Sequence, residues 1–168
     1  IALKTWRLNN LDSPGASWSE DFFMTAEVYG QGTDNNYYYD NGFDSVINFK
    51  FPKGDTLDHL EEIYSEYSNK INTTEDFNVL SYISSHDTGL TRGNLINLGT
   101  KLLLAPGGIQ IYYGDESNRL ASTSIITTAV DQGSRSDMNW DSLDKEVLSH
   151  FQKLGQFRNN HLSVGGGI

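Results

Sequence analysis

Two short apolar runs along the chain end abruptly in acidic residues. Residues 22–26 run directly into Glu27, and residues 79–85 run into His86 and Asp87. A short apolar run bounded by polar residues predicts a strand that is buried on both of its faces. In parallel α/β proteins, ligands bind at the carboxyl ends of the strands. The pattern therefore predicts that two strands bring these acids into one pocket.

Strand patterns alternate with helix patterns along the rest of the chain. The predicted strands cover residues 22–28, 43–49, 79–84 and 109–113, and a loop rich in Gly, Asn and Tyr covers residues 30–42. The predicted helices cover residues 2–8, 57–67, 95–103 and 143–158. Asp55 or Thr56 is placed to cap the second of these helices, and Asp141 or Ser142 the last. The glycines at 165–167 indicate a frayed end or a domain boundary.

This alternation predicts a parallel sheet with right-handed crossover connections. Four strands would leave two open edges, and a complete (β/α)8 barrel needs roughly 250 residues. With 168 residues, the chain is therefore predicted to be half of such a barrel and not a complete fold.

Composition narrows the class of partner. The chain holds 22 Asp and Glu against 12 Lys and Arg, for a formal net charge of −10. This balance argues against nucleic acid and against an anionic membrane surface as partners. The chain has no cysteine, so disulfides and zinc-thiolate sites are excluded. No stretch is long and apolar enough to predict a membrane span.

The residues at the strand ends suggest acid–base chemistry. Two carboxylates in different surroundings are the usual equipment for glycoside hydrolysis. Apolar residues before Glu27 are expected to favour its protonated form, and the hydroxyls of Ser84, Ser85 and Thr88 to hold Asp87 as an anion. An ion-pair role for Glu27 and a surface or capping role for His86 and Asp87 are the structural alternatives.

Four segments of the chain resemble the α-amylase-type glycoside hydrolases. Residues 22–30 are similar to the fifth-strand segment of that family, which ends in the catalytic Glu, and residues 79–88 to the seventh-strand segment with its His-Asp pair. Residues 108–116 resemble the eighth-strand signature, and residues 137–140 the loop before the last barrel helix. The order and spacing match, and the type of enzyme that the chain resembles most is the bacterial periplasmic or secreted α-amylase. The resemblance implies that the chain is the C-terminal half of a (β/α)8 TIM barrel, about strands 5–8 with their helices. Residues 1–168 would form one partial catalytic barrel domain that starts in the helix after strand 4 and ends after the last barrel helix.

The resemblance implies a role for each candidate site residue. Glu27 would be the general acid/base, and Asp87 the transition-state stabiliser. His86 would bind the same sugar through a hydrogen bond, and Tyr29, two residues past Glu27, would touch the substrate. The substrate class implied is an α-glucan, an oligosaccharide or a polysaccharide of the starch and maltodextrin type with α-1,4 bonds.

The nucleophile of the family has no counterpart in this chain. In the family it is an Asp at the end of the fourth strand, and Asp12 and Asp21 lie in a polar loop instead. We therefore expect the chain alone to be inactive, because a retaining mechanism needs its nucleophile. We expect no metal or other cofactor in this chain, while calcium in the parent enzyme would have its ligands upstream.

The other conspicuous residues are given structural interpretations. Asp115 and Glu116 follow Gly114 and are explained most simply by turn chemistry, or by pairing with Arg119 or Arg135. The remaining residues have these predicted roles: packing or sugar stacking for the tyrosines at 37–39, packing for Trp18 and Trp140, a glycosylation pattern at Asn72, and structural or solvated positions for His59, His150 and His161.

Two alternatives to the enzyme fragment stay open. One is a glucan-binding relative that keeps the fold without catalysis, and the other is a flavodoxin-like interaction domain built from four strands. For the half-barrel, we expect the missing N-terminal half of the barrel to be a partner. We also expect a homodimer to form through the exposed half-barrel edges.

Overall fold

The strands form one parallel sheet in sequence order. The computed structural model describes residues 23–34, 37–75, 77–122 and 133–168. The strands are β1 (Thr25–Ala26), β2 (Ser45–Asn48), β3 (Val79–Tyr82) and β4 (Gly108–Gln110), and they pair in the order β1-β2-β3-β4. Parallel strands that pair in sequence order are typical of a barrel wall. In a flavodoxin-like sheet the strands are also parallel, but their spatial order reverses at a switch point. The sheet therefore favours the half-barrel prediction over the flavodoxin-like alternative.

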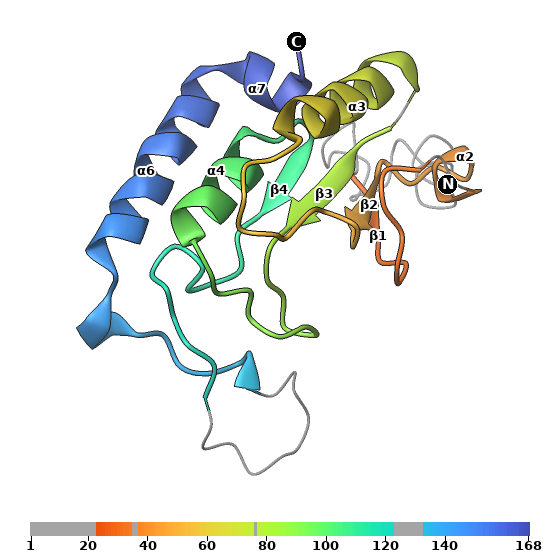
Figure 1. Ribbon diagram of the computed structural model, residues 1–168. Coiled ribbons are helices and arrows are strands. Elements are labelled where there is room, and N and C mark those ends of the chain that lie inside the picture. The colour runs from red at the N-terminus through yellow and green to blue at the C-terminus, as the bar shows by residue number, and fades with distance from the viewer. Residues whose placement is uncertain (1–22, 35–36, 76, 123–132) are drawn as a thin grey trace, which may run out of the picture.

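Helices connect the strands and cover one side of the sheet (Figure 1). The helix α3 (Leu60–Thr73) joins β2 to β3, and α4 (Leu95–Leu104) joins β3 to β4. The helix α6 (Lys145–Asn160) packs against α4, and the short α7 (Leu162–Gly166) follows it. A four-residue helix, α2 (Tyr37–Asp40), and a 3-10 turn, η2 (Trp140–Ser142), complete the secondary structure of the described residues. No helix among these residues has the length and apolarity to cross a membrane.

The two faces of the sheet are buried to different extents. Val46 and Val79 are 0% and 1% exposed and belong to the apolar core under α3 and α4. Their neighbours on the opposite face, Ile47 and Leu80, are half-buried. The expectation of strands buried on both faces is therefore wrong at Ile47 and Leu80, while Tyr82 on the same face is buried at 2% exposure. A half-barrel has this asymmetry, because its inner face is completed only by the other half of the barrel.

The predicted elements exist, but several boundaries and caps differ. The helix predicted at 57–67 is α3, which begins three residues later, after His59 in the left-handed region (φ 59°) and without a side-chain cap. The helix predicted at 143–158 is α6, and it is capped by Asp144, whose Oδ1 accepts from Glu146 N and Val147 N at 3.2 Å each. The backbone bond from Val147 is the main reason that the pKa of Asp144 is lowered. The caps predicted at 55–56 and 141–142 are therefore wrong, and the predicted helix at 2–8 lies outside the described residues.

The glycines near the C-terminus are packed against the body of the protein. Gly107 N donates to Gly165 O at 2.8 Å, and Asn72 Nδ2 donates to Gly166 O at 2.9 Å. The prediction that these glycines form a frayed end is therefore wrong. The amide of Asn72, which the glycosylation pattern singled out, is occupied by this contact and by one to Ser68 O.

Candidate active site

The candidate acids lie along one cleft at the carboxyl ends of the strands. Glu27 directly follows β1, and His86 and Asp87 follow β3 by a few residues. The cleft has a volume of about 80 Å³ and is lined by Glu27, Ile47, Phe49, Tyr82, Ser85, His86, Asp87 and Gln110. Parallel strands place their carboxyl ends at one edge of the sheet, so residues far apart in the sequence meet here. Three of the four residues singled out from the sequence are thus brought together.

The carboxylate of Asp87 is held by two basic side chains. Arg135 Nη2 donates to Asp87 Oδ1 at 3.1 Å, and His86 Nε2 lies 3.1 Å from Oδ2. The hydroxyls expected around this carboxylate point elsewhere. Ser85 Oγ bonds Thr88 Oγ1 at 3.0 Å and accepts from the backbone N–H of Asp87 at 3.3 Å. The predicted hydroxyl cradle is therefore wrong, and a guanidinium and an imidazole contact this carboxylate instead.

Glu27 is exposed in the described structure, so the expected burial of its side chain is wrong. Its charge is nevertheless close to the other groups of the cleft. Burial raises the pKa of the Tyr82 phenol, and the negative charges of Glu27 and Asp87 raise it further. Tyr82 therefore lies within the electrostatic reach of both acids.

Tyr29 lies at the rim of the cleft. Its side chain is 90% exposed, and its ring centroid is 5.4 Å from that of Phe49. Phe49 lines the cleft and meets Tyr82 edge to face at 5.9 Å. The three rings therefore contact one another in a row, from the exposed Tyr29 through Phe49 to the buried Tyr82. An exposed ring of this kind offers an apolar face to a sugar, although Tyr29 is not among the residues that line the cleft.

Sequence reasoning missed several residues of the site. Tyr82 and Gln110 are paired across β3 and β4 and both face the cleft, a position that the period-two alternation of strands could have indicated. Lys53 places its Nζ 3.6 Å from the centroid of the Tyr82 ring. Burial lowers the pKa of Lys53 to about 8, and the charge of Asp115 opposes this shift. No local pattern signals Lys53, because it comes from an irregular loop.

The acidic pair after β4 does not reach the cleft. Asp115 is fully buried, and its Oδ1 accepts from Arg92 Nη1 at 2.8 Å. Burial raises the pKa of Asp115, and Arg92 opposes the rise. Glu116 accepts from the backbone N–H of Gly114 at 2.9 Å, as turn chemistry predicts. The pairing expected with Arg119 or Arg135 is wrong, since Arg92 takes that place.

The tyrosines at 37–39 and the tryptophans divide between core and surface. Tyr39 is 6% exposed and donates its hydroxyl to Asn78 O at 2.9 Å, so it packs as a core residue. Tyr37 and Trp140 are 71% and 73% exposed, so packing does not account for either. Trp18 lies outside the described residues.

The remaining histidines have local partners away from the cleft. His59 Nδ1 lies 3.1 Å from Glu62, His150 bonds Thr100 Oγ1 at 2.8 Å, and His161 stacks on Phe157 at 4.2 Å. Within the described residues, no group of three or more His, Cys, Asp or Glu side chains is arranged to hold a metal ion.

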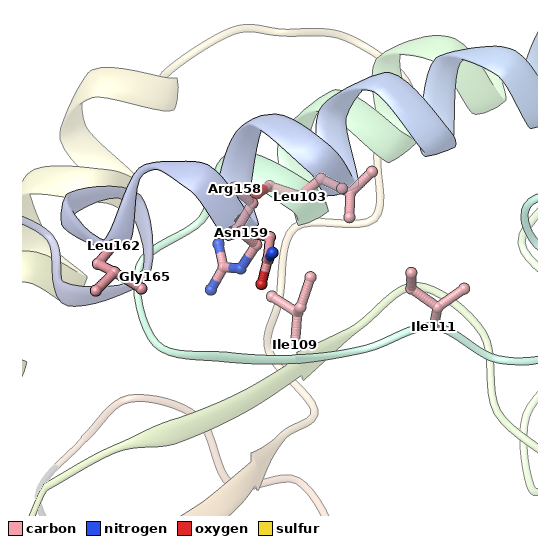
Figure 2. Close-up of a pocket in the computed structure, with 8 residues that line it drawn as sticks. Leu103, Ile109, Ile111, Arg158, Asn159, Leu162 and Gly165 are labelled. Atoms are coloured by element: carbon pink, nitrogen blue, oxygen red, sulfur yellow. Dashed lines mark hydrogen bonds between the residues drawn. The ribbon is translucent and has the colours of Figure 1, made fainter.

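A larger cavity of about 400 Å³ lies at the open edge of the sheet, on the side of the helices (Figure 2). It is lined by Leu103, Ile109, Ile111, Gly155, Arg158, Asn159, Leu162 and Gly165. Arg158 spans the end of α4, donating to Leu103 O at 3.0 Å and to Ala105 O at 2.7 Å. The lining contains no carboxylate, so the cavity offers no acid–base chemistry.

The sequence is similar to that of a named bacterial protein. The chain is 39% identical over 173 residues to a protein described as periplasmic alpha-amylase from Escherichia coli K12. The match covers 99% of this chain and 25% of the relative, so the chain spans about a quarter of the relative's length. No family model matches the chain.

Solved structures with the same fold are also covered only in part. A debranching enzyme from Nostoc punctiforme superposes with a TM-score of 0.58 at 22% identity, over 95% of this chain and 37% of that chain. An α-amylase from H. orenii gives 0.52 at 16% identity, over 97% and 40%. A cyclic α-maltosyl-(1→6)-maltose hydrolase from Arthrobacter globiformis gives 0.56 at 17% identity, over 96% and 39%. These matches confirm the predicted half of a (β/α)8 barrel.

Proposed function

Because the chain belongs to the α-amylase-type family of glycoside hydrolases, we propose that it supplies half of the active site of an enzyme that hydrolyses α-1,4-linked glucans with retention. The observation that carries this proposal is the cleft that Glu27, His86 and Asp87 share at the carboxyl ends of the strands. A group that protonates the leaving oxygen and a carboxylate that stabilises the cationic transition state are two of the groups that glycosidic cleavage requires.

Each residue has a distinct role in the proposed reaction. Glu27 donates its proton to the glycosidic oxygen as the bond to the leaving sugar breaks, and then takes a proton from the attacking water. Asp87 accepts hydrogen bonds from hydroxyls of the sugar being cleaved, and these bonds tighten as the ring becomes an oxocarbenium ion. His86 binds the same sugar, and Tyr29 stacks on a sugar at the rim.

The reaction needs a nucleophile that this half does not supply. Retaining hydrolysis proceeds through a covalent glycosyl-enzyme intermediate. In the family, the nucleophile comes from a strand that precedes the segments matched here. Asp12 and Asp21, the acids that precede Glu27 at a distance, lie outside the described residues. We therefore propose that residues 1–168 bind a glucan weakly and do not hydrolyse it.

The partners follow from the same proposal. The other half of the barrel would complete the inner face and cover the apolar cavity beside β4 (Figure 2). Without it, we propose that a second copy covers the open edge, where Ile111 and Leu162 are 43% and 84% exposed. We propose a periplasmic or secreted location, after the relative's name. We also propose that calcium, where the complete enzyme uses it, has ligands outside this chain.

A complementation experiment tests the proposal. The segment of the Escherichia coli relative that precedes the matched stretch is placed before residue 1 to give an extended protein. We expect the extended protein to release reducing sugar from starch as a monomer. The 168-residue chain is expected to elute as a dimer and to release none. Starch binding without hydrolysis by the extended protein would favour a non-catalytic relative. Equal hydrolysis by the short chain would contradict the proposed division of the site.

A further inference from the structure

Arg119 is a buried cation whose hydrogen bonds end on neutral oxygens. Its side chain is 1% exposed. Its Nε and Nη2 donate to Tyr113 O at 3.1 and 2.9 Å, Nη2 also donates to Ser134 O at 3.0 Å, and Nη1 donates to Ser136 O at 3.1 Å and to its hydroxyl. No ion pair joins it to a carboxylate within the described part of the chain. Burying a charge without an opposite charge beside it is costly, so the presence of a guanidinium here needs an explanation.

The guanidinium joins two segments that are distant in sequence. Its acceptors lie in the turn after β4 and in residues 134–136. The Tyr113 ring lies 3.9 Å from the guanidinium carbon, and the Tyr113 hydroxyl donates to Ser136 O at 2.8 Å. Tyr112 donates its hydroxyl to Ser134 O at 3.2 Å. The turn after β4 therefore holds residues 134–136 through three side chains at once.

The segment held in this way contacts the candidate catalytic turn directly. Ser134, which is fully buried, donates its hydroxyl to His86 O at 3.0 Å. The next residue, Arg135, bonds the Asp87 carboxylate at 3.1 Å. One contact fixes the backbone of the His86–Asp87 pair, and the other orients the acid. Residues 134 and 136, which Arg119 binds, flank the residue that meets Asp87.

We propose that Arg119 is a positioning residue that holds the His86–Asp87 pair through the 134–136 segment. Exposed ion pairs such as Arg135–Asp87 contribute little when both side chains must be ordered for the contact. Fixing the backbone on both sides of Arg135 removes part of that ordering cost. The catalytic consequence of this positioning rests on the proposed function, whereas the positioning itself does not.

The chemistry of a guanidinium fits this task. Arginine presents five N–H donors in a rigid planar fork, while lysine presents a compact charge on a flexible stem. Here the fork binds three separate carbonyls, those of Tyr113, Ser134 and Ser136. The turn is also shaped around it: a Cβ on Gly114 would lie 2.4 Å from Arg119 Nε, and Gly114 has a φ of 86°. The local backbone therefore accommodates this side chain at a position that only glycine fills readily.

NMR on the 168-residue chain tests the positioning. Arg119→Lys keeps the charge and removes the fork. We expect the imidazole nitrogen shifts of His86 and the carboxyl carbon shift of Asp87 to move. We expect amide exchange at both residues to accelerate by about tenfold or more, which corresponds to about 1.4 kcal/mol of lost local stability. Unchanged signals at both residues in a folded Arg119→Lys protein would overturn the proposal.

Arg158→Lys is the matched control. Arg158 also donates to backbone carbonyls, at the end of α4 and away from the cleft. Its substitution is expected to lower the melting temperature and leave the His86 and Asp87 signals unchanged. Equal changes from Arg158→Lys would mean that any loss of stability loosens the turn, and would overturn the proposal. If Arg119→Lys does not fold, Ser134→Ala removes the hydroxyl that bonds His86 O and keeps Arg119. The same signals must then move, and their constancy would overturn the proposal.

Kinetics in the extended protein test the catalytic consequence. Misplacing a catalytic group by about 1 Å can cost roughly a hundredfold in rate. We expect Arg119→Lys to lower kcat by about ten- to a hundredfold with little change in KM. An inactive wild-type extended protein would count against the proposed function and leave the NMR result standing. An active wild type with an equally active Arg119→Lys variant would overturn the catalytic part of the inference.

Discussion

Asp87 and Glu27 both follow a strand, yet their surroundings differ. Asp87 is paired with Arg135 and His86, whereas Glu27 is exposed at the edge of the same cleft. The order of apolar and acidic residues was enough to predict that these two acids meet, because strand ends converge in a parallel sheet. It was not enough to predict their partners. Arg135 reaches Asp87 from 48 residues away, and no local pattern encodes such a contact.

Lys53 makes the stability of the protein depend on pH. Its pKa is lowered by burial from 10.5 to about 8 in the folded chain. Between these values the unfolded state binds more protons than the folded state, so the free energy of unfolding rises with pH. Lys53→Met removes this contribution. We therefore expect the stability of the wild type relative to Lys53→Met to increase between about pH 7.5 and about pH 9.5.

Denaturant unfolding of both proteins at the two pH values measures the effect. Lys153→Met, which removes an exposed lysine from α6, controls for the loss of a lysine in general. A difference between wild type and Lys53→Met that stays constant, or that shrinks as pH rises, would show that Lys53 is not desolvated.

At the scale of elements, periodicity predicted the helices and strands better than it predicted their ends. The end of α4 could be predicted, because Pro106 disfavours helical backbone at Ala105, which is extended (φ −68°, ψ 138°). The start of α3 could not, because His59 adopts a left-handed conformation and no capping side chain marks it. The cap of α6 was misplaced by two to three residues, since η2 uses the acid and serine that looked like caps.

The contact between α4 and α6 depends on the absence of a side chain at Gly99. A Cβ at this position would lie 2.5 Å from Cε2 of Phe151, which is 4% exposed. Overpacking of this kind costs about 1–3 kcal/mol and outweighs the roughly 0.5–1 kcal/mol gained when alanine replaces glycine in a helix. We expect Gly99→Ala to lower the free energy of unfolding by about 1 kcal/mol.

Gly155 in α6 provides the matched comparison for this measurement. A Cβ there meets nothing within 4 Å. Gly155→Ala should therefore raise the free energy of unfolding by about 0.5–1 kcal/mol in the same urea titration. Stabilisation by both substitutions would mean that the two helices are less closely packed than the structure indicates.

At the scale of the whole molecule, the two faces of the sheet are buried as expected for half of a barrel. One face carries Val46 and Val79 under helices, and the opposite face carries the half-buried Ile47 and the cleft. Length and alternation predicted this half-barrel, because 168 residues cannot close eight strands and eight helices. The same incompleteness limits the site: the cleft brings together Glu27, His86 and Asp87, the proposed acid, sugar-binding histidine and stabiliser, and the proposed nucleophile would come from the other half.

The most direct test of the central claim is the rate at which the extended protein cleaves maltooligosaccharides when Glu27 is replaced. General acid–base catalysis contributes about 10²- to 10⁴-fold, so Glu27→Gln should lower kcat by a factor in this range. With a maltosyl fluoride, whose leaving group departs without protonation, added azide should restore part of the rate of Glu27→Ala, because azide attacks the glycosyl-enzyme without a general base. Wild-type hydrolysis by Glu27→Gln would contradict the assignment of Glu27 as the proton donor and, with it, the account of the cleft as half of a glucan-cleaving site.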